Sequence, residues 1–330
     1  MQSKILVTGA SGFVGSNLVK NLVAQGNKVS VLLRKDSYHP FLTNLKIKKF
    51  YGDIKNPDSI KKAMKCCQYV YHSAAFISYN KGDAKGMYEV NVIGTRNIMN
   101  TALKLKIKKV VHVSACAAIG YSKGLVDEKL KFLIRYKKIA YMYTKHLAEV
   151  EVIKAFRKGL NVTIVNPCTI FGQGDKKLNT GAVIKNIKEG KLLAAPPGGT
   201  AVVSVDDVVN GILLAMKYGK SGERYILSNE NISYKELFNI IAKELKVKKI
   251  NIQLPHFSYY LLLSVFCIIE RLAIFLHKGC KITSEVISIS FKYRYFSSQK
   301  ARKELNWKPS VPIREAIGKA IDFYKKERLL

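Results

Sequence analysis

The sequence predicts an α/β protein built on a doubly wound parallel sheet. Short apolar runs without polar alternation follow one another along the first half of the chain, separated by longer segments with apolar residues at helical spacing. That alternation is typical of parallel strands covered by helices on both faces. The first apolar run ends in a glycine-rich turn that opens a helix. Together these features predict a Rossmann-type sheet, followed by a smaller, mostly helical C-terminal lobe.

Composition supports a globular chain and argues against two classes of protein. The 330 residues are 48% hydrophobic and 24% charged, enough to bury a sizeable core. The formal net charge of +33 could attract acidic partners, but the lysines are spread along the chain without a basic block. We therefore expect solvated lysine-rich faces and no nucleic-acid partner. The six cysteines include no C-x-x-C pair, so neither a disulfide framework nor a metal site is expected.

The elements of the nucleotide-binding half follow in order from these patterns. No leader-like segment precedes the first strand, so a cytoplasmic location is expected. Strands are predicted at residues 4–8, 28–33, 47–51, 69–72, 109–114 and 161–165, and helices at 14–25, 59–65, 87–104 and 139–158.

The pattern loosens after residue 166. Short strands are predicted at 202–205 and 225–227, and helices at 206–217 and 233–246. Ser233 is the expected N-cap of the last helix, and Glu236 completes a capping box. The predicted division is a nucleotide-binding domain over 1–165 with a returning segment at about 201–230, and a substrate-binding lobe over 166–200 and 231–330.

Residues 255–278 form an unusually apolar segment. The stretch 257–269 is almost entirely apolar, Glu270 and Arg271 interrupt it, and it resumes to residue 276. A central ion pair is costly in a membrane span. Two alternatives stay open: a helix that covers an apolar substrate pocket, and a helix of 257–276 that lies in a membrane interface, peripheral on the inner face. A full span is a third.

The glycine turn predicts a dinucleotide site. Gly9 permits the tight turn, Gly12 lets backbone approach a pyrophosphate, and Gly15 lets the helix pack close to the sheet. The pyrophosphate would lie at the helix N-terminus, where free N–H groups favour anions. The predicted contacts in this turn are Gly9, Ser11, Gly12, Phe13, Val14 and Gly15.

The end of the second strand bears on the choice of cofactor. An acid there would bind the ribose 2′-hydroxyl of NAD, but this sequence has Arg34 followed by Lys35. A cation suits a 2′-phosphate, so NADP is the predicted cofactor. Asp36 keeps NAD possible, because a small shift in register would bring a carboxylate into play.

Tyr141 and Lys145 are the predicted chemical centre. Their spacing of four residues places them on one face of a helix. A tyrosine with an ordinary pKa near ~10 is a poor acid or base at neutral pH, and a neighbouring ammonium would lower that pKa. Tyr141 could then exchange a proton with a substrate oxygen while hydride moves at carbon. A surface tyrosine–lysine pair is the alternative interpretation.

With these motifs in place, the chain resembles the extended short-chain dehydrogenase/reductase family, and among its members the dihydroflavonol 4-reductase and 3β-hydroxysteroid dehydrogenase proteins. The resemblance covers nearly the whole chain in order. It rests on residues 8–15, Gly52-Asp53-Ile54, His72-Ser73-Ala74-Ala75, Asn91-Val92-Ile93-Gly94-Thr95, Val113-Ser114-Ala115, Tyr141 to Glu149, Asn166-Pro167, Val205-Asp206-Asp207-Val208 and Glu304-Leu305-Asn306-Trp307.

The resemblance implies further contacts and a partner. Asp53 and Ile54 would flank the adenine, Ala74 and Ala75 would line the nucleotide, and Pro167 would begin a loop near the nicotinamide. Asn91 would support the active-site side of its helix. The family often forms homodimers through a four-helix interface, which here would use 87–104 and 139–158.

One position departs from the family pattern. A catalytic Ser or Thr usually follows the fifth strand, and the better alignment places Ala115 there. Ser114 is the candidate to replace it, and Cys116 could face the site instead. If neither does, the hydroxyl that stabilises the substrate oxygen is missing. A third interpretation makes Ser114 a strand-end hydroxyl bonded to backbone.

The leading functional interpretation is an NAD(P)-dependent oxidoreductase that interconverts a ketone and a secondary alcohol on a small apolar substrate, such as a sterol, flavonoid or oxoacyl compound. Two alternatives remain: a sugar-nucleotide epimerase or dehydratase that keeps its NAD tightly bound, and a non-catalytic cofactor-binding protein.

Overall fold

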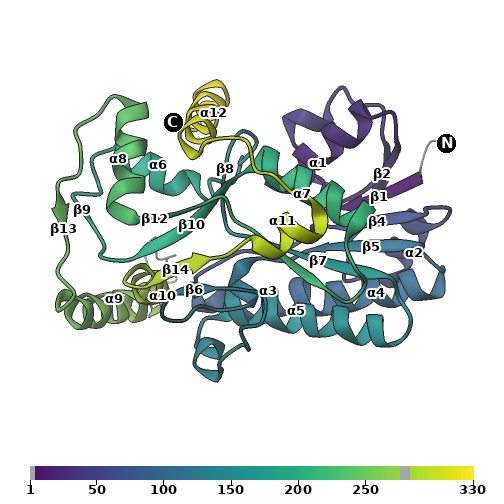
Figure 1. The fold of residues 1–330 in the computed structure, drawn as a ribbon, viewed down its shortest axis with the longest axis horizontal. Coiled ribbons are helices and arrows are strands. Elements are labelled where there is room, and N and C mark those ends of the chain that lie inside the picture. Colours follow the sequence, from purple (N-terminus) through teal and green to yellow (C-terminus); the bar gives the residue numbers. More distant parts are fainter. Residues whose placement is uncertain (1–3, 276–282) are drawn as a thin grey trace.

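The larger sheet has seven strands in the order β3-β2-β1-β4-β5-β7-β11, all parallel (Figure 1). The computed structural model describes residues 4–275 and 283–330, with only the backbone at 273–275. This strand order confirms the predicted Rossmann-type sheet. The strands are β1 (Lys4–Thr8), β2 (Lys28–Leu33), β3 (Lys48–Tyr51), β4 (Tyr69–His72), β5 (Lys109–Val113), β7 (Val162–Pro167) and β11 (Arg224–Leu227).

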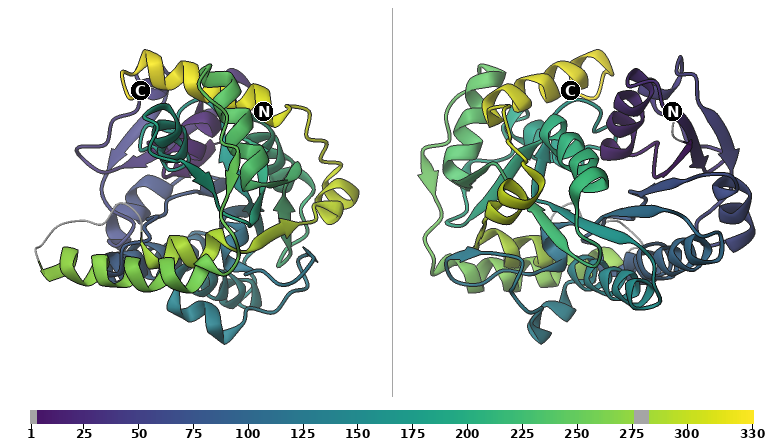
Figure 2. Two further views of the ribbon diagram at one scale, coloured as in Figure 1. Left: turned by 90° about the vertical axis from the view of Figure 1, so that its left-hand side faces the viewer. Right: turned by 45° about the vertical axis from the view of Figure 1, so that its right-hand side comes forward.

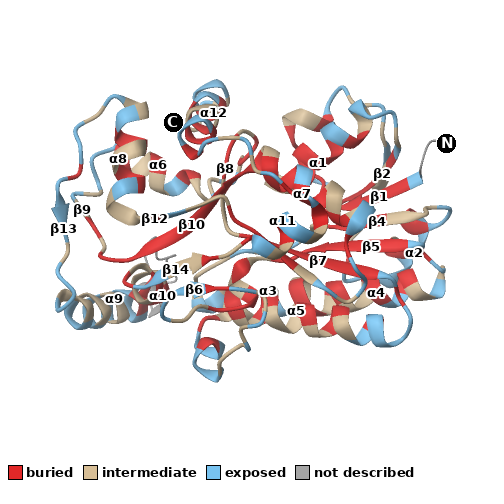
Figure 3. Ribbon diagram, in the orientation of Figure 1, coloured by how far each residue is buried: buried red, intermediate tan, exposed pale blue. Residues whose placement is uncertain are grey.

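Helices cover both faces of this sheet, and the buried residues form two layers between them and the strands (Figure 3). On one face α1 (Phe13–Ala24) and α7 (Val205–Tyr218) pack together. On the other face lie α2 (Pro57–Met64), α4 (Gly94–Lys104) and α5 (Ala140–Arg157). Because both faces are covered, the central strands are apolar throughout, as their unbroken sequence runs indicated.

The helix predicted at 87–104 has an irregular first half. It begins with α3 (Ala84–Met87), widens into a π-helical segment over Tyr88–Ile93, and continues as α4. Asn91 lies in the π-helical segment and is buried. Apolar spacing alone cannot distinguish such a segment from a regular helix, because both give an amphipathic pattern.

The C-terminal lobe contains a second sheet that the sequence analysis missed. Its order is β12-β10-β14-β6, with β8 also paired to β10, and a separate pair joins β9 to β13. The predicted strand at 202–205 is β10, which starts earlier and belongs to this sheet, whereas α7 and β11 return to the large sheet. The strands are β6 (Leu125–Val126), β8 (Thr169–Phe171), β9 (Ala194–Ala195), β10 (Gly199–Ser204), β12 (Glu230–Ser233), β13 (Ile252–Gln253) and β14 (Tyr293–Phe296).

Helices complete the lobe. Ser233 caps α8 as predicted, its side chain accepting from the amide of Glu236 at 3.2 Å. An apolar cluster joins α6, α8 and α12 beneath the second sheet. The helices are α6 (Gly181–Lys188), α8 (Tyr234–Leu245), α9 (Ser258–Phe275), α10 (Ser284–Ser290), α11 (Gln299–Leu305) and α12 (Ile313–Lys326).

Helix α9 lies along one edge of the lobe beside α10 (Figure 2). Glu270, the acidic residue of α9, points inward. It is 4% exposed and accepts a hydrogen bond from Lys81 Nζ at 3.0 Å. The last residues of the predicted segment, 276–278, lie outside the described residues. Within the described chain, no helix is long and apolar enough to cross a membrane. Seven large side chains at its start and along it are exposed and form what we call the α9 stripe: Phe257, Tyr260, Leu261, Val265, Ile268, Ile269 and Leu272.

Candidate active site

The turn between β1 and α1 leaves almost no room for side chains. Gly9 has a φ of +72°, and a Cβ there would lie 2.5 Å from the backbone nitrogen of Ala74. A Cβ on Gly15 would lie 2.1 Å from the carbonyl oxygen of Gly9. The amide of Gly12 donates to that same oxygen at 2.9 Å and closes the turn. The turn therefore presents bare backbone at the carboxyl end of β1.

The N-terminus of α1 is prepared for an anion. Gly12 is its N-cap, no side chain caps the helix, and no acid lies in the first turn. The first N–H groups of a helix carry the positive end of its dipole, so this end fits a diphosphate. Ser11, Phe13 and Val14 are half-buried around it. The structure thus brings together the residues predicted from the glycine spacing, and they fit a dinucleotide.

The residues predicted to choose between the cofactors are exposed. Arg34, Lys35 and Asp36 follow β2 directly, at the same edge of the sheet as the glycine turn. Two cations and one acid are therefore available at the position that contacts the adenosine ribose in Rossmann folds.

The remaining predicted cofactor contacts differ in their burial and in their contacts with the rest of the chain. Asp53 is half-buried, and its Oδ1 accepts from the amide of Lys55 at 2.8 Å. Ile54 is buried in the core, where it packs on Gly94. Ala74 lies beneath Gly9, so it shapes the turn. Ala75 is exposed, and Pro167 ends β7 at the same edge of the sheet.

A chain of side-chain hydrogen bonds runs from the first strand to the predicted catalytic helix. Thr8 Oγ1 and His72 Nδ1 are 2.7 Å apart, and His72 Nε2 lies 3.0 Å from Thr95 Oγ1. Thr95 donates to the carbonyl of Asn91, whose amide donates to Thr144 Oγ1 on α5 at 3.2 Å. All five side chains are buried. The chain fixes α5 relative to the strand that carries the glycine turn.

Asn91 also holds the loop after β4. Its Oδ1 accepts from the amide of Phe76 at 2.8 Å, and its Nδ2 donates to the Phe76 carbonyl at 2.9 Å. Asn91 therefore satisfies both backbone groups of Phe76, which is the supporting position that the family resemblance implied.

Tyr141 and Lys145 are both buried on α5, with 8% and 2% exposure. Lys145 Nζ donates to the carbonyl of Val113 at the end of β5, 3.2 Å away. The ring of Tyr79 packs edge-on against that of Tyr141, with centroids 5.7 Å apart. The alternative of a surface tyrosine–lysine pair is therefore wrong.

The electrostatics of the pair differ from the prediction. Burial lowers the pKa of Lys145 to about 8, and Glu149 opposes this shift. Burial raises the pKa of Tyr141, and the charge of Arg294 acts in the opposite direction. The predicted lowering of the Tyr141 pKa was wrong for the chain alone, because burial outweighs the neighbouring positive charge.

Ser114 has a free hydroxyl. Its Oγ is buried without a hydrogen-bond partner, whereas its amide donates to the carbonyl of Val165 at 2.8 Å. The interpretation of Ser114 as a hydroxyl bonded to backbone is therefore wrong. Cys116 follows close by, with its sulfur 2.8 Å from that of Cys168 and 3.1 Å from the Asn166 carbonyl.

Several residues that no motif indicated lie around Tyr141 and Tyr79, on elements other than α5. Arg294 on β14 donates through Nη2 to the hydroxyl of Tyr234 at 2.8 Å. Glu285 on α10 is 6% exposed, and burial raises its pKa to about 7. Arg294 and Glu285 both act electrostatically on Tyr79. These residues lie far from the motifs in sequence, and only the pairing of β14 with β10 and β6 brings Arg294 here.

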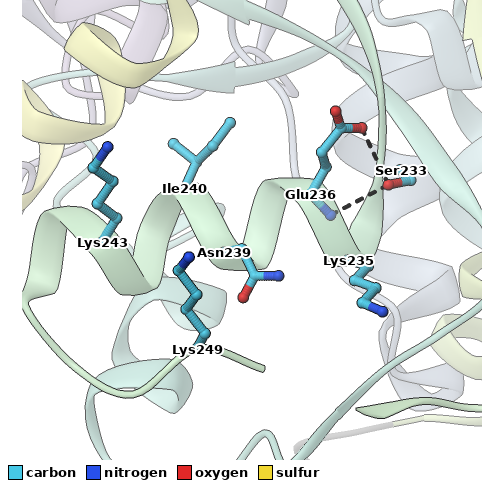
Figure 4. A pocket seen from close by; sticks show the side chains of 7 residues that line it. All are labelled: Ser233, Lys235, Glu236, Asn239, Ile240, Lys243 and Lys249. Carbon is cyan, nitrogen blue, oxygen red and sulfur yellow. Dashed lines mark hydrogen bonds between the residues drawn. The ribbon is translucent and has the colours of Figure 1, made fainter. Parts of the chain in front are cut away.

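A shallow hollow of about 410 Å³ lies elsewhere, on α8 of the C-terminal lobe (Figure 4). Lys235, Lys243 and Lys249 line it with four other residues. None of the predicted cofactor or catalytic residues borders it.

The parallel sheet, the bare glycine turn and the buried Tyr141–Lys145 pair define an NAD(P)-dependent oxidoreductase of the extended short-chain type. Comparison with known families agrees. The chain belongs to the NAD dependent epimerase/dehydratase family, whose sequence profile matches residues 5–228.

Individual relatives extend this similarity along the chain. Sterol demethylase protein B of Methylococcus capsulatus is 38% identical over 68% of this chain and 70% of its own length. A Synechocystis protein with a provisional dihydroflavonol 4-reductase name is 33% identical over 98% of this chain and 95% of its own. The crystal structure of gox2253 has 34% identity and a TM-score of 0.85, covering 99% of both chains.

Proposed function

We propose that the protein interconverts a ketone and a secondary alcohol on an apolar substrate, with Tyr141 as general acid and base and NADP as the cofactor. The supporting observation is the position of Tyr141, buried on α5 between the glycine-turn edge of the sheet and the substrate-side residues Tyr79 and Arg294. The relatives named for sterol demethylation and dihydroflavonol reduction support an apolar substrate.

Each residue of the site has a defined task in this reaction. When bound, the nicotinamide supplies or accepts hydride. Tyr141 would exchange the proton at the substrate oxygen, with its hydroxyl at hydrogen-bond distance. Ser114 would donate its unpartnered hydroxyl to the same oxygen. Lys145 would supply a positive charge from the end of β5, where it donates to the carbonyl of Val113, the residue before Ser114.

The proposed preference for NADP depends on Arg34. A guanidinium forms charge-assisted bonds to a phosphate monoester, each contributing roughly 1.5–3 kcal/mol. Arg34→Ser should therefore weaken NADPH binding by a factor of ten or more and leave NADH binding nearly unchanged. Equal loss for both cofactors would show that Arg34 does not read the 2′-phosphate.

Cofactor oxidation tests the reaction itself. NADPH consumption is followed against sterol ketones, flavonoids, oxoacyl compounds and UDP-sugars, with Tyr141→Phe beside the wild type. We expect net consumption with an apolar ketone and a loss of about 10²–10⁴-fold in Tyr141→Phe. Full turnover by Tyr141→Phe contradicts the assignment. Conversion of a sugar nucleotide without net consumption would indicate an epimerase.

We further propose that α9 lies on a membrane surface. The α9 stripe exposes seven large side chains on an otherwise folded protein, among them Tyr260 at 75% and Ile268 at 58%. Glu270 is withdrawn into the lobe, so the stripe carries no acid. An apolar helix face on a strongly basic protein matches an interfacial helix on anionic lipid.

Liposome flotation tests this proposal. The wild type should float with vesicles of phosphatidylcholine and phosphatidylglycerol, and less with phosphatidylcholine alone. Tyr260→Glu with Ile268→Glu should abolish flotation. A control with the same added charge, Tyr51→Glu with Tyr218→Glu, changes exposed tyrosines outside α9 and should float normally. Failure of the wild type to float, or equal behaviour of both variants, contradicts the proposal.

A further inference from the structure

Arg294 is a half-buried cation without a counter-charge. Its Nε is shielded from solvent and has no hydrogen-bond partner. Its Nη2 has the neutral hydroxyl of Tyr234 at 2.8 Å. Among the described residues, no Asp or Glu oxygen forms an ion pair with Arg294, although eleven ion pairs occur elsewhere.

Such a cation destabilises the folded protein unless a ligand or water pairs with it. A donor shielded from solvent has given up its hydrogen bond to water, so leaving it without a partner destabilises the folded protein. The surrounding phenols do not supply the missing charge, because burial raises the pKa of Tyr79 and Tyr121 and keeps both neutral at neutral pH.

The position of Arg294 relates it to the reacting centre. It lies on β14 opposite Thr200 of β10, and the alternation of a strand places it on the same face as Phe296. Phe296 belongs to the buried cluster that contains Cys116, two residues after Ser114. The ring of Tyr79 packs against that of Tyr141, and the charge of Arg294 acts on both phenols.

We propose that Arg294 binds a carboxylate carried by the substrate close to its reacting ketone or alcohol. This inference rests on the proposed oxidoreductase function and specifies its substrate as an apolar acid. A carboxylate brings the single negative charge that Arg294 lacks, and it can accept hydrogen bonds from the guanidinium. A phosphate would bring up to two charges, more than the single charge of Arg294 balances.

A matched pair of ligands tests this proposal without requiring turnover. The probes are 3-hydroxydodecanoate and its methyl ester, which share the apolar chain and hydroxyl but differ in charge. Binding to the NADP-loaded protein is measured by calorimetry. We expect the wild type to bind the acid at least tenfold more tightly than the ester. Equal affinities, or binding of neither probe, would overturn the proposal.

Substitutions assign the preference to Arg294. Arg294→Gln should weaken binding of the acid about tenfold or more and leave the ester unchanged. Arg294→Lys should give an intermediate loss, because the charge remains without the planar fork. Lys292→Gln removes an exposed cation just before β14 and should change neither affinity. Unchanged acid binding in a folded Arg294→Gln protein contradicts the proposal.

Two further measurements separate the possible failures. If Arg294→Gln does not fold, Arg294→Lys carries the test, since a purely structural role would change acid and ester binding alike. Tyr141→Phe should keep the full preference for the acid, because Arg294 acts in binding and not in proton transfer. A wild type that discriminates acid from ester but turns over no ketone would contradict the proposed reaction and leave the carboxylate site standing.

Discussion

The two sides of the candidate site differ in how their polar groups are satisfied. On the cofactor side, Thr8, His72 and Asn91 bond to one another or to backbone through a continuous buried chain. On the substrate side, Ser114 Oγ, Glu285 Oε2 and Arg294 Nε are buried without partners. Along this chain the first side is a completed scaffold for a ligand that binds backbone, although both ring nitrogens of His112, beside His72, lack partners. The second side has polar atoms that only a ligand or water can complete.

Gly15→Ala should have the largest effect, because it changes the glycine turn on the cofactor side directly. The added Cβ would lie 2.1 Å from the Gly9 carbonyl oxygen, so the glycine turn must move. We expect loss of NADPH binding and a lower melting temperature. Gly82→Ala is the matched control, since nothing lies within 4 Å of its added Cβ. Normal cofactor binding by Gly15→Ala would show that the turn tolerates rearrangement.

Lys145→Met should come next, with opposite effects on activity and stability. Activity should fall by about 10²-fold or more, because the charge beside Tyr141 is lost. Lys145 has a pKa of about 8 when folded and 10.5 otherwise, so between these values the unfolded chain binds more protons. The contribution of Lys145 to the stability of the wild type therefore rises with pH between its folded and unfolded pKa values.

The corresponding measurement compares melting temperatures at several pH values. Lys145→Met should melt above the wild type at pH ~7, and the difference should shrink toward pH ~10. Lys138→Met, which changes an exposed lysine, should show neither effect. A pH-independent difference would mean that packing, and not the buried charge, decides the stability.

Ser114→Ala tests the substrate side, where buried polar atoms lack partners. Removing a hydroxyl that stabilises the substrate oxygen should lower kcat by about 10²-fold. Because this hydroxyl has no partner in the folded chain, the melting temperature should stay constant or rise slightly. Ser122→Ala, at a half-buried position outside the site, serves as the control. Full activity with Ser114→Ala would show that the serine has no role in the reaction. Its unpartnered hydroxyl would then no longer distinguish the substrate side from the cofactor side.

Asn91→Leu should have the smallest effect on chemistry and a measurable one on stability. It leaves the amide and carbonyl of Phe76 and the hydroxyl of Thr144 without their partner. We expect a loss of about 1–3 kcal/mol in urea unfolding. Asn21→Ala, which removes an exposed bond to Gln25, should change stability little. An unchanged midpoint for Asn91→Leu would show that water replaces the amide.

The same contrast decides how far the sequence predicts the structure. The large sheet and the glycine turn follow from local rules, because apolar runs and glycine spacing act over a few neighbouring residues. The Tyr141–Lys145 pair is equally local, being one turn of helix. The strands of β6, β8 and β14 have at most four residues each and alternate poorly, so no periodic signal marks them.

The substrate side depends on those short strands and was therefore not predicted. Arg294 lies more than 150 residues from Tyr141 in sequence, and its approach requires the pairing of β14 with β10. The pKa of Tyr141 was predicted in the wrong direction because burial, which raises it, cannot be read from helical spacing.

The π-helical segment at Tyr88–Ile93 has a consequence for how this chain tolerates deletions. A π turn takes up one residue more than an α turn at the same point of a helix. Removing one residue there would restore regular α-helix and turn α3 by ~100° about the helix axis relative to α4. Asn91 would then leave Phe76 while the rest of the fold stayed intact. Deletion of one residue at this place would therefore leave the loop after β4 without the support of Asn91.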